Sequence, residues 1–510
     1  MSVHAVMPKE WFSPVGRLLS RIGLGVLTPF VSPALVDEAL VVVGRGEQRF
    51  RALPSRLGVY FVLALCLLRA KSSTAVVRAM IPLEGLIRLA GVGWRVPSST
   101  GLTKLRDRLG VVPFQLLFGA LARVAPTLVR PWSHTFGLRV VAWDGTEVEV
   151  AGTDANREWF RPHRGTSGDP VGMPKIRLLV LLACGTRHLI GAVTGTLSQG
   201  EQTLAQRLMS RLAPGMLLLA DRNFLGHRLW TACRARGAHL LWRAKQNTPQ
   251  LPVQQVLEGG RSWLSTLYDP DDMRAWRRNV RRNRQRGHRP PKPRPIKGTV
   301  VRVVEALITV TVDGVTRTEK YRLVTSLLDP ALAPAEHLIA LYARRWIAET
   351  GIREIKTVLL AGQPPRGQTP IRAQQELWAT LVVYQAIRML ISMAALSKPA
   401  LNLDPSRISF TAARDAAEHA ITTTPANASR HLAWLAQDLC QQLITIHSSY
   451  RIFPRALKNT LSRYPYRGKN RQLTSGNATY QITITPTTTP TTSPPTTTTT
   501  STNPAQPRAA

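Results

Sequence analysis

The spacing of hydrophobic residues changes along the chain and separates a helical part from a strand-rich part. Up to about residue 130 the apolar positions follow a helical period. Prolines and serines stand where helices would begin, at Pro33–Asp37, Ser72–Thr74 and Pro97–Thr100. The pattern therefore predicts an all-α N-terminal domain over residues 15–130.

From Leu138 onward the apolar residues form short β-rich runs between glycine and proline breaks. These runs predict four strands with a helix before the fourth: Leu138–Trp143, Ile176–Cys184, His188–Thr194, the helix Glu201–Leu212, and Met216–Ala220. Strands followed by a helix and another strand indicate an α/β sheet with a parallel part. Two more strands are expected within 246–329, and helical patterns return over 334–396 and end near residue 447.

Charge narrows the class of partner. The 510 residues include 67 Lys and Arg against 30 Asp and Glu, a net charge of +37. Such an excess implies a polyanion, either nucleic acid or an anionic membrane surface. The apolar runs are far shorter than the roughly 20 residues of a membrane span, so nucleic acid is favoured and no membrane is expected. The basic helix after Pro97 is then compatible with a helix-turn-helix unit on DNA, or with plain helical packing.

Cysteine usage and the two ends of the chain add three expectations. Four separated cysteines form no zinc signature and no disulfide framework. The first residues contain no apolar stretch typical of a signal peptide, so we expect a cytoplasmic protein. Almost every residue over 483–503 is Thr, Pro or Ser, which predicts a disordered tail over 473–510.

Two aspartates and one helical stripe are candidates for chemistry. Asp144 and Asp221 each follow an apolar run, and the carboxyl ends of strands are where open α/β sheets place ligand sites. Either could instead be a turn residue that caps the next element. Further along, Tyr342, Arg345, Glu349 and Lys356 fall within about 60° of one helix face. Ordinary surface ion pairs would be the alternative explanation of that stripe.

Together these residues suggest phosphodiester chemistry. Two strand-end aspartates and a helical glutamate form an oxygen-only ligand set, which suits Mg²⁺ or Mn²⁺. Two such ions can activate a water or a 3′-hydroxyl and stabilise the leaving oxygen. Arg345 and Lys356 flank the glutamate and would hold the scissile phosphate or its neighbours.

The sequence resembles the DDE transposases of bacterial insertion sequences, the insertion element 4 family. The Tyr342-x2-Arg345-x3-Glu349-x6-Lys356 pattern matches the signature of that family, and Ala142–Asn156 and Leu217–Phe224 resemble its two aspartate blocks. The resemblance implies a ribonuclease-H-like catalytic core over 135–400, with a β-rich insertion at 246–329. It places the helical domain before this core and a C-terminal helical region, 401–470, after it.

The same resemblance implies roles for residues and partners. Asp144, Asp221 and Glu349 would be catalytic ligands of two Mg²⁺ or Mn²⁺ ions, and Tyr342, Arg345 and Lys356 would contact phosphates near the cleaved end. Family members cut double-stranded DNA at terminal inverted repeats and join the freed end to target DNA. A homodimer in the synaptic complex and a bacterial, nucleoid-associated location follow.

Several other residues are possible DNA contacts. Arg222 follows the second aspartate and would seat the substrate strand, whereas His163 is either a phosphate contact or a solvated side chain. Trp263 and Trp276 would stack on an unpaired base, or belong to the core of the insertion. Eleven Lys or Arg between 274 and 297, with no acid, predict a solvated loop that orders on DNA; its central cations are Arg277, Arg278, Arg281 and Arg282.

Two other functions remain compatible with these residues. A ribonuclease-H-like nuclease or resolvase would use the same carboxylates without joining strands. A basic DNA-binding protein, or an inactive transposase copy, would bind element ends without cutting them.

Overall fold

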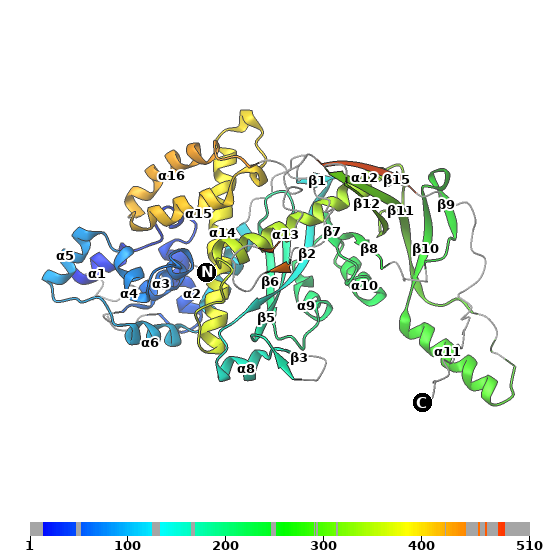
Figure 1. Cartoon of the computed structure of the whole chain (residues 1–510), viewed down its shortest axis with the longest axis horizontal. Coiled ribbons are helices and arrows are strands. Elements are labelled where there is room, and N and C mark those ends of the chain that lie inside the picture. The colour runs from blue at the N-terminus through cyan, green and yellow to red at the C-terminus, as the bar shows by residue number, and fades with distance from the viewer. Residues whose placement is uncertain are drawn as a thin grey trace, which may run out of the picture.

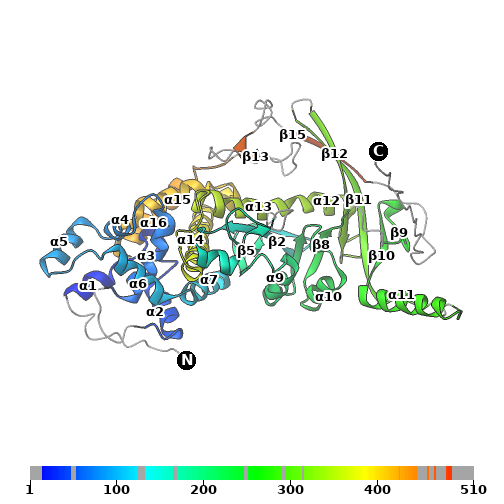
Figure 2. The same ribbon diagram turned by 60° about the horizontal axis from the view of Figure 1, so that its bottom comes forward.

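The computed structural model is elongated, with helices gathered at one end and a long sheet that runs toward the other (Figures 1 and 2). It describes residues 14–46, 53–124, 133–164, 169–245, 251–289, 291, 294–312, 315–423, 425–444, 457–458, 465–466 and 478–484. Every structural statement below concerns these residues.

The N-terminal part is helical, as the apolar spacing predicts. Its helices are α1 (Pro14–Ser20), the 3₁₀ turn η2 (Gly25–Leu27), α2 (Pro33–Val42), α3 (Ser55–Leu67), α4 (Ser73–Ala79), α5 (Leu83–Gly91), α6 (Ser99–Leu109) and α7 (Val112–Val124). Ser32, Ser72 and Ser98 begin α2, α4 and α6, because each hydroxyl accepts a bond from a backbone N–H of the first turn. Every residue of α3 is buried, so this helix forms the centre of the domain.

A mixed sheet forms the middle of the molecule, in the order β6-β5-β2-β7-β8-β12-β11-β10-β9. Its first strands are β1 (His134–Thr135), β2 (Leu138–Glu149), β5 (Lys175–Ala183), β6 (Leu189–Gly195), β7 (Met216–Ala220) and β8 (His239–Arg243). Strand β2 runs antiparallel to β5 and parallel to β7, and β7 runs parallel to β8. Helices α9 (Glu201–Leu208) and α10 (His227–Ala235) provide the crossovers to β7 and β8. This is the ribonuclease-H-like arrangement that was expected.

The first strand is longer than its apolar run. It continues past Trp143 to Glu149, because residues up to Glu149 stay paired with β5. Asp144 therefore lies inside β2, and the prediction that it ends the strand is wrong. After β2 come the helix α8 (Asp154–Phe160) and the small hairpin β3 (His163–Arg164) and β4 (Pro170–Val171).

The segment expected as a β-rich insertion extends the same sheet, because β12 pairs with β8. Its elements are β9 (Gln255–Leu257), the short turn η4 (Glu258–Gly260), β10 (Ser262–Tyr268), α11 (Pro270–Gln285), β11 (Gly298–Val312) and β12 (Val315–Thr325). The first half of the arginine-rich stretch is the helix α11, so the prediction of a loop is wrong there. Asp269 caps this helix and Pro270 occupies its first turn, which are strong start signals.

The helical block after the insertion is broken into pieces. It contains α12 (Ala335–Tyr342), the 3₁₀ turn η5 (Ala343–Arg345), α13 (Trp346–Arg353), the π-helix η6 (Glu354–Leu359) and α14 (Pro370–Leu396). The four signature residues therefore do not share one regular α-helix. By length and composition alone, helix α14 could cross a membrane. However, 83% of its apolar 18-residue stretch is buried inside the protein. It is the central helix of the fold.

The described residues of the C-terminal part are mostly helical as far as Leu439. The helical elements are the 3₁₀ turns η7 (Pro399–Leu401), η8 (Pro405–Arg407) and η9 (Ala420–Thr422), with α15 (Phe410–His419) and α16 (Pro425–Leu439). Two-residue strands β13 (Leu457–Lys458) and β14 (Pro465–Tyr466) pair with each other.

One piece of the expected disordered tail is a strand. Strand β15 (Ala478–Ile484) pairs antiparallel with β11, and Ile482 and Ile484 pack against the core. The prediction of disorder is wrong for these residues, because their alternating Tyr and Ile were hidden beside a Thr-rich run. The Thr/Pro-rich residues beyond Ile484 lie outside the described part of the chain.

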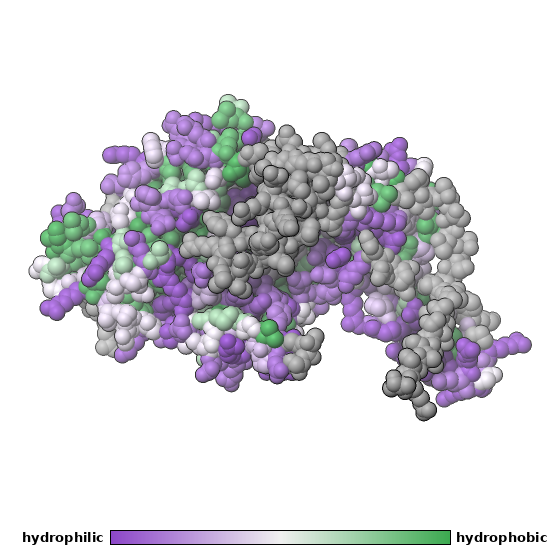
Figure 3. Space-filling model, viewed as in Figure 1, coloured by the Kyte–Doolittle hydropathy of each residue, from purple (hydrophilic) through white to green (hydrophobic). Residues whose placement is uncertain are grey.

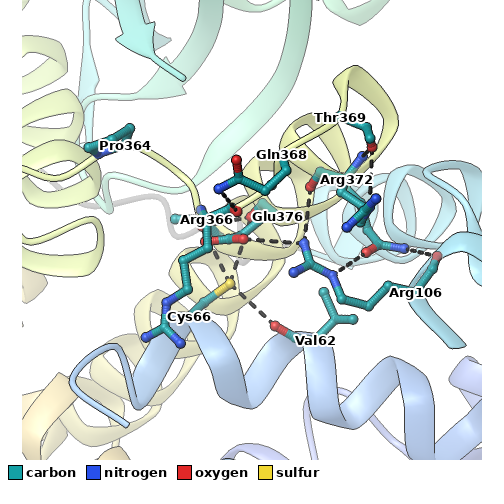
Figure 4. Close-up of polar contacts among 12 residues, drawn as sticks. Val62, Cys66, Arg106, Pro364, Arg366, Gln368, Thr369, Arg372 and Glu376 are labelled. Carbon is teal, nitrogen blue, oxygen red and sulfur yellow. Dashed lines mark hydrogen bonds and ion pairs between the residues drawn. The ribbon is translucent and has the colours of Figure 1, made fainter. Parts of the chain in front are cut away.

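The N-terminal helices are fixed to α14 by a buried ion cluster (Figure 4). Glu376 of α14, which is fully buried, accepts bonds from Arg69, from Arg106 and from the backbone N–H of Arg366. Arg106 also donates to Gln375 at 3.0 Å, and Arg108 of the same helix donates to the carbonyl of Leu53 at 2.7 Å. These two arginines of α6 therefore support the packing interpretation of the basic helix.

Candidate active site

The two aspartates lie side by side where β2 and β7 separate. The parallel register pairs Ala142 with Leu219, so Asp144 and Asp221 each stand two residues further along the same edge. Trp143 directly precedes Asp144, and Phe224 follows Asp221 by three residues. Their rings pack against each other beside this edge, with centroids 5.6 Å apart. The backbone N–H of Asn223 donates to Asp221 Oδ1 at 2.8 Å and so holds the Asp221 side chain in place.

The signature segment from Tyr342 to Lys356 is tied to the edge at both of its ends. The buried Tyr342 hydroxyl donates to the carbonyl of Ala220, directly before Asp221, at 3.1 Å. Lys356 Nζ donates to Thr146 Oγ1 at 3.3 Å and to the carbonyl of Glu147 at 3.0 Å. These bonds bring the segment across the ends of β7 and β2, and α13 packs on β2.

Arg345 and Glu349 lie between these two anchors. Arg345 Nη2 donates to Glu349 Oε1 at 3.0 Å, and the Arg345 side chain is only 12% exposed. Arg345 also lies over the ring of Trp346, 5.4 Å from its centroid. The signature thus delivers one carboxylate and one guanidinium to the place where the aspartates lie.

Charge at this edge is unbalanced. The pKa of Asp144 is raised to about 7, chiefly by burial of the group; Arg345 opposes the rise, and repulsion from Glu349 and Asp221 contributes to it. The repulsion indicates that the three carboxylates lie near one another. Arg345 offsets only part of the rise in the pKa of Asp144, so a further cation beside this carboxylate would be favourable.

The chemistry of the donors fits a hard divalent cation. All three groups are carboxylates, which Mg²⁺ and Mn²⁺ prefer, and repulsion among them is what a bound cation would offset. Among the described residues, no group of three or more His, Cys, Asp or Glu side chains is already arranged around an ion position. In this structure Arg345 pairs with Glu349 at 3.0 Å and opposes the rise in the pKa of Asp144.

The other predicted contacts around the aspartates differ in their surroundings. Arg222 is exposed beside Asp221. His163 is exposed as well, and its Nε2 lies 2.7 Å from Glu147 Oε2. Glu147 also accepts a bond from Arg177 at 3.0 Å, so His163 belongs to a local ion cluster near the Lys356 anchor.

Of the two tryptophans suggested for base stacking, one is part of the core. Trp263 is 4% exposed, and its Nε1 donates to the carbonyl of Leu251 at 3.4 Å. Since β10 turns this side chain inward, the structure favours the alternative that Trp263 belongs to the core of the insertion. Trp276 lies on α11 and is half-buried.

Helix α11 carries the arginine run away from the sheet (Figures 1 and 2). Arg278, Arg281 and Arg282 are exposed and Arg277 is half-buried. Within the described residues, none of these four forms an ion pair, whereas Arg274 and Arg294 pair with Asp271 and Asp272. The surface at this end is strongly hydrophilic (Figure 3).

Sequence reasoning missed Glu201, the first residue of α9. Its Oε1 lies so close to Gly145 that a Cβ on this glycine would be 2.3 Å away. An acidic residue is common at the start of a helix, so Glu201 gave no sign of a further role in the sequence. The available signal was its place between the strand Leu189–Gly195 and the strand Met216–Ala220, which Asp221 directly follows.

Comparison with known proteins supports the expected family. Residues 21–119 match the model for the insertion element 4 transposase N-terminal region, and residues 135–385 match the transposase DDE domain. The chain is 25% identical, over 458 residues, to "Transposase InsG for insertion sequence element IS4" of Escherichia coli (strain K12), covering 89% of this chain and 96% of that protein. It is 23% identical to "Putative transposase InsZ" of the same strain, over 41% of this chain and 66% of that protein.

Among solved structures, one similar chain belongs to a piggyBac transposase synaptic complex with hairpin DNA. The match covers 85% of this chain and 86% of that chain, at 9% identity and a TM-score of 0.39.

Proposed function

The chain belongs to the insertion element 4 family of DDE transposases and is a DNA transposase, and from this premise we propose how its residues perform the reaction. Asp144, Asp221 and Glu349 hold one or two divalent cations, Mg²⁺ or Mn²⁺, at the edge between β2 and β7. The observation that carries this proposal is the shared register of Asp144 and Asp221 beyond the last paired residues, with Glu349 close enough to raise the pKa of Asp144.

A bound divalent cation would supply Lewis-acid stabilisation of charge on the attacking and leaving oxygens. The residues of the chain do the positioning. Arg345 lies beside the carboxylates and has the geometry to contact a phosphate oxygen once a cation compensates Glu349. Lys356 and Arg222 extend this positive charge on the two sides of the edge.

Tyr342 acts in this proposal as a positioning residue. It is 5% exposed, and its hydroxyl is bound to the carbonyl of Ala220. That bond fixes the start of the signature segment against the strand that carries Asp221. The hydroxyl becomes a phosphate contact only if this bond opens.

DNA recognition requires a surface larger than the catalytic edge. We assign part of it to α11, whose Arg277, Arg278, Arg281 and Arg282 have no acidic partner within the described residues. Such cations release counterions when they contact phosphates. The partners are double-stranded DNA with terminal inverted repeats and then target DNA, and two copies of the chain would hold two ends in one synaptic complex.

The experiment that tests the proposal supplies the full chain with DNA that carries the inverted repeats flanking its gene, together with a supercoiled target and Mg²⁺. Cut ends and joined products are separated on a sequencing gel. The expected result is cleavage at the repeat boundary followed by joining to the target, and neither product in chelator.

Other outcomes point to the other functions. Cleavage without joining, under conditions where a pre-cut end is also not joined, would indicate a nuclease or resolvase. Specific binding to the repeats without cleavage in either Mg²⁺ or Mn²⁺ would indicate an inactive copy.

A further inference from the structure

Glu201 lies at the catalytic edge but on the other face of the sheet from Glu349. Leu204 and Ala205 of α9 belong to the core that contains Trp143, whereas Ala348 and Ile352 beside Glu349 belong to the opposite core. At the catalytic edge, the two faces of the sheet are connected where the pairing of β2 with β7 ends. A carboxylate at the first residue of α9 therefore approaches this opening from the side that the signature segment does not cover.

Gly145 is what lets Glu201 reach the edge. A Cβ at this position would lie 2.3 Å from Glu201 Oε1 and 2.9 Å from its carboxyl carbon. The carboxylate consequently occupies the space that any side chain after Asp144 would fill. Gly145 does not need its backbone freedom, because its φ is not in the left-handed region. The missing side chain is the feature that matters.

Glu201 is also joined to the segment that holds Asp221. Its side chain forms a hydrogen bond with Asn223. The neighbouring Gln202 donates from Nε2 to the carbonyl of Asn223 at 2.6 Å, and the N–H of Asn223 donates to Asp221. The start of α9 and the Asp221 turn are thus one hydrogen-bonded unit.

The surroundings of Glu201 are short of positive charge. Burial raises its pKa, and repulsion from Asp221 adds to this effect, while Arg177 opposes it. Arg177 is already bound to Glu147 at 3.0 Å and to the carbonyl of Gln199 at 2.9 Å. Within the described part of the chain, Glu201 and Asp221 are thus two acidic groups close together at this edge, and Arg177 is engaged with other partners.

We propose that Glu201 is a fourth carboxylate of the cation-binding centre, held over Gly145 and beside Asp221. The inference rests on the proposed function, because it concerns the same divalent cation. It extends that function by assigning a ligand, or a carboxylate that binds through a coordinated water, from the α9 face. It also assigns a role to Gly145, whose missing side chain leaves the space that the Glu201 carboxylate occupies.

The competing explanation is that Glu201 only stabilises the N-terminus of α9. An acidic residue in the first turn interacts favourably with the helix dipole. In that case Glu201→Gln would lower the melting temperature of the protein and would leave its affinity for a cation unchanged. That role would also not depend on residue 145.

The test measures Mn²⁺ binding to the full chain without DNA, by the loss of the free-ion electron paramagnetic resonance signal. Glu201→Gln is expected to weaken binding by about tenfold or more, as loss of a supporting ligand does at other metal sites. Gly145→Ala should weaken it in the same direction, although the charge of Glu201 is retained. Glu149→Gln, an exposed carboxylate on the same strand, should leave binding unchanged.

Circular dichroism melts and DNA cleavage accompany the titrations. Native melting with weakened Mn²⁺ binding in both variants supports the proposal. Binding unchanged in Glu201→Gln, with or without a lower melting temperature, overturns it and leaves the helix-start explanation. If Asp144→Asn and Asp221→Asn also bind Mn²⁺ normally, the proposed cation site itself has failed, which is a different result.

Discussion

Two carboxylates at the signature segment, the buried Glu354 and the half-buried Asp144, have opposite electrostatic surroundings. Glu354 of η6 pairs with Arg388 and with Arg187 (2.8 Å), and accepts a bond from the Tyr384 hydroxyl at 3.2 Å. Burial alone would raise the pKa of Glu354, but these arginines hold it below its usual value. Asp144 has one nearby guanidinium and two nearby carboxylates, and its pKa rises to about 7.

This difference separates a structural carboxylate from one that is arranged for chemistry. At Glu354 the protein supplies every compensating charge itself, and the cluster fixes η6 to α14 and to the turn before β6. At Asp144 compensation is incomplete, and the shortage of positive charge is the property that a cation and DNA require. The two sites should therefore respond in opposite ways to the same Asp→Asn or Glu→Gln change.

The largest expected effect is on cleavage at the edge. Each of the substitutions Asp144→Asn, Asp221→Asn and Glu349→Gln should raise the activation barrier for cleavage by several kcal/mol. The cleavage rate should then fall about 10³-fold or more, because charge compensation of the cation is lost. DNA affinity should persist or increase, since repulsion between carboxylate and phosphate falls. Gel-shift and single-turnover cleavage assays measure the two quantities; near-normal cleavage by Glu349→Gln would remove that residue from the site.

At Glu354 the same chemical change should mainly affect stability. Glu354→Gln leaves Arg388 and Arg187 uncompensated in the interior, which costs about 3–5 kcal/mol of unfolding free energy. Urea unfolding measures it, with Glu418→Gln of a partly exposed pair as the control, expected to cost less than about 1 kcal/mol. A stability equal to that of the wild type would show that the cluster is not the anchor described above.

A smaller effect, on DNA binding, is expected from α11, where four arginines form no ion pair within the described residues. Replacing Arg277, Arg278, Arg281 and Arg282 together by Gln should weaken binding to element ends by about 10²-fold and reduce the salt slope by roughly three to four units. The fold should be retained, because this part of α11 is mostly exposed. Arg414→Gln, which changes an ion-paired arginine, is the control. An unchanged slope would place the DNA footprint on another surface, such as the N-terminal helices.

The smallest effect concerns the strand within the tail. Ending the chain after Asn477 removes β15 and the partly buried Ile482 and Ile484, which should cost about 1–2 kcal/mol of unfolding free energy. Ending it after Ile484 should cost nothing measurable. Equal melting temperatures for the two truncations would contradict the pairing of β15 with β11.

Much of the fold could be predicted because its signals are local. Serine caps, strand-length apolar runs and the bounds of β7 follow from the sequence alone. The failures have a shared physical cause, since each depends on a partner distant in sequence. Pairing with β5 extends β2 through Asp144 to Glu149, and pairing with β11 orders β15.

The candidate site shows the same division. Asp144 and Asp221 could be proposed because each follows an apolar run, and Glu349 because of the signature spacing, although β2 continues past Asp144. Trp263 could not be assigned, because only the sheet shows that it faces the core. Glu201 could not be found either, since its importance depends on an approach to Gly145, 56 positions earlier, that no local pattern encodes.

The central claim is that the edge lacks positive charge which a divalent cation supplies, and unfolding free energies test it most directly. The folded pKa of Asp144 lies above the ordinary 3.8, so its ionisation costs stability as the pH rises toward about 7 and the full cost persists above that pH. At pH 8 in chelator, Asp144→Asn should therefore be more stable than the wild type, by on the order of 2–4 kcal/mol. Mg²⁺ should stabilise the wild type and remove that difference. A variant that is no more stable in chelator, with a wild type that does not respond to Mg²⁺, would contradict the account.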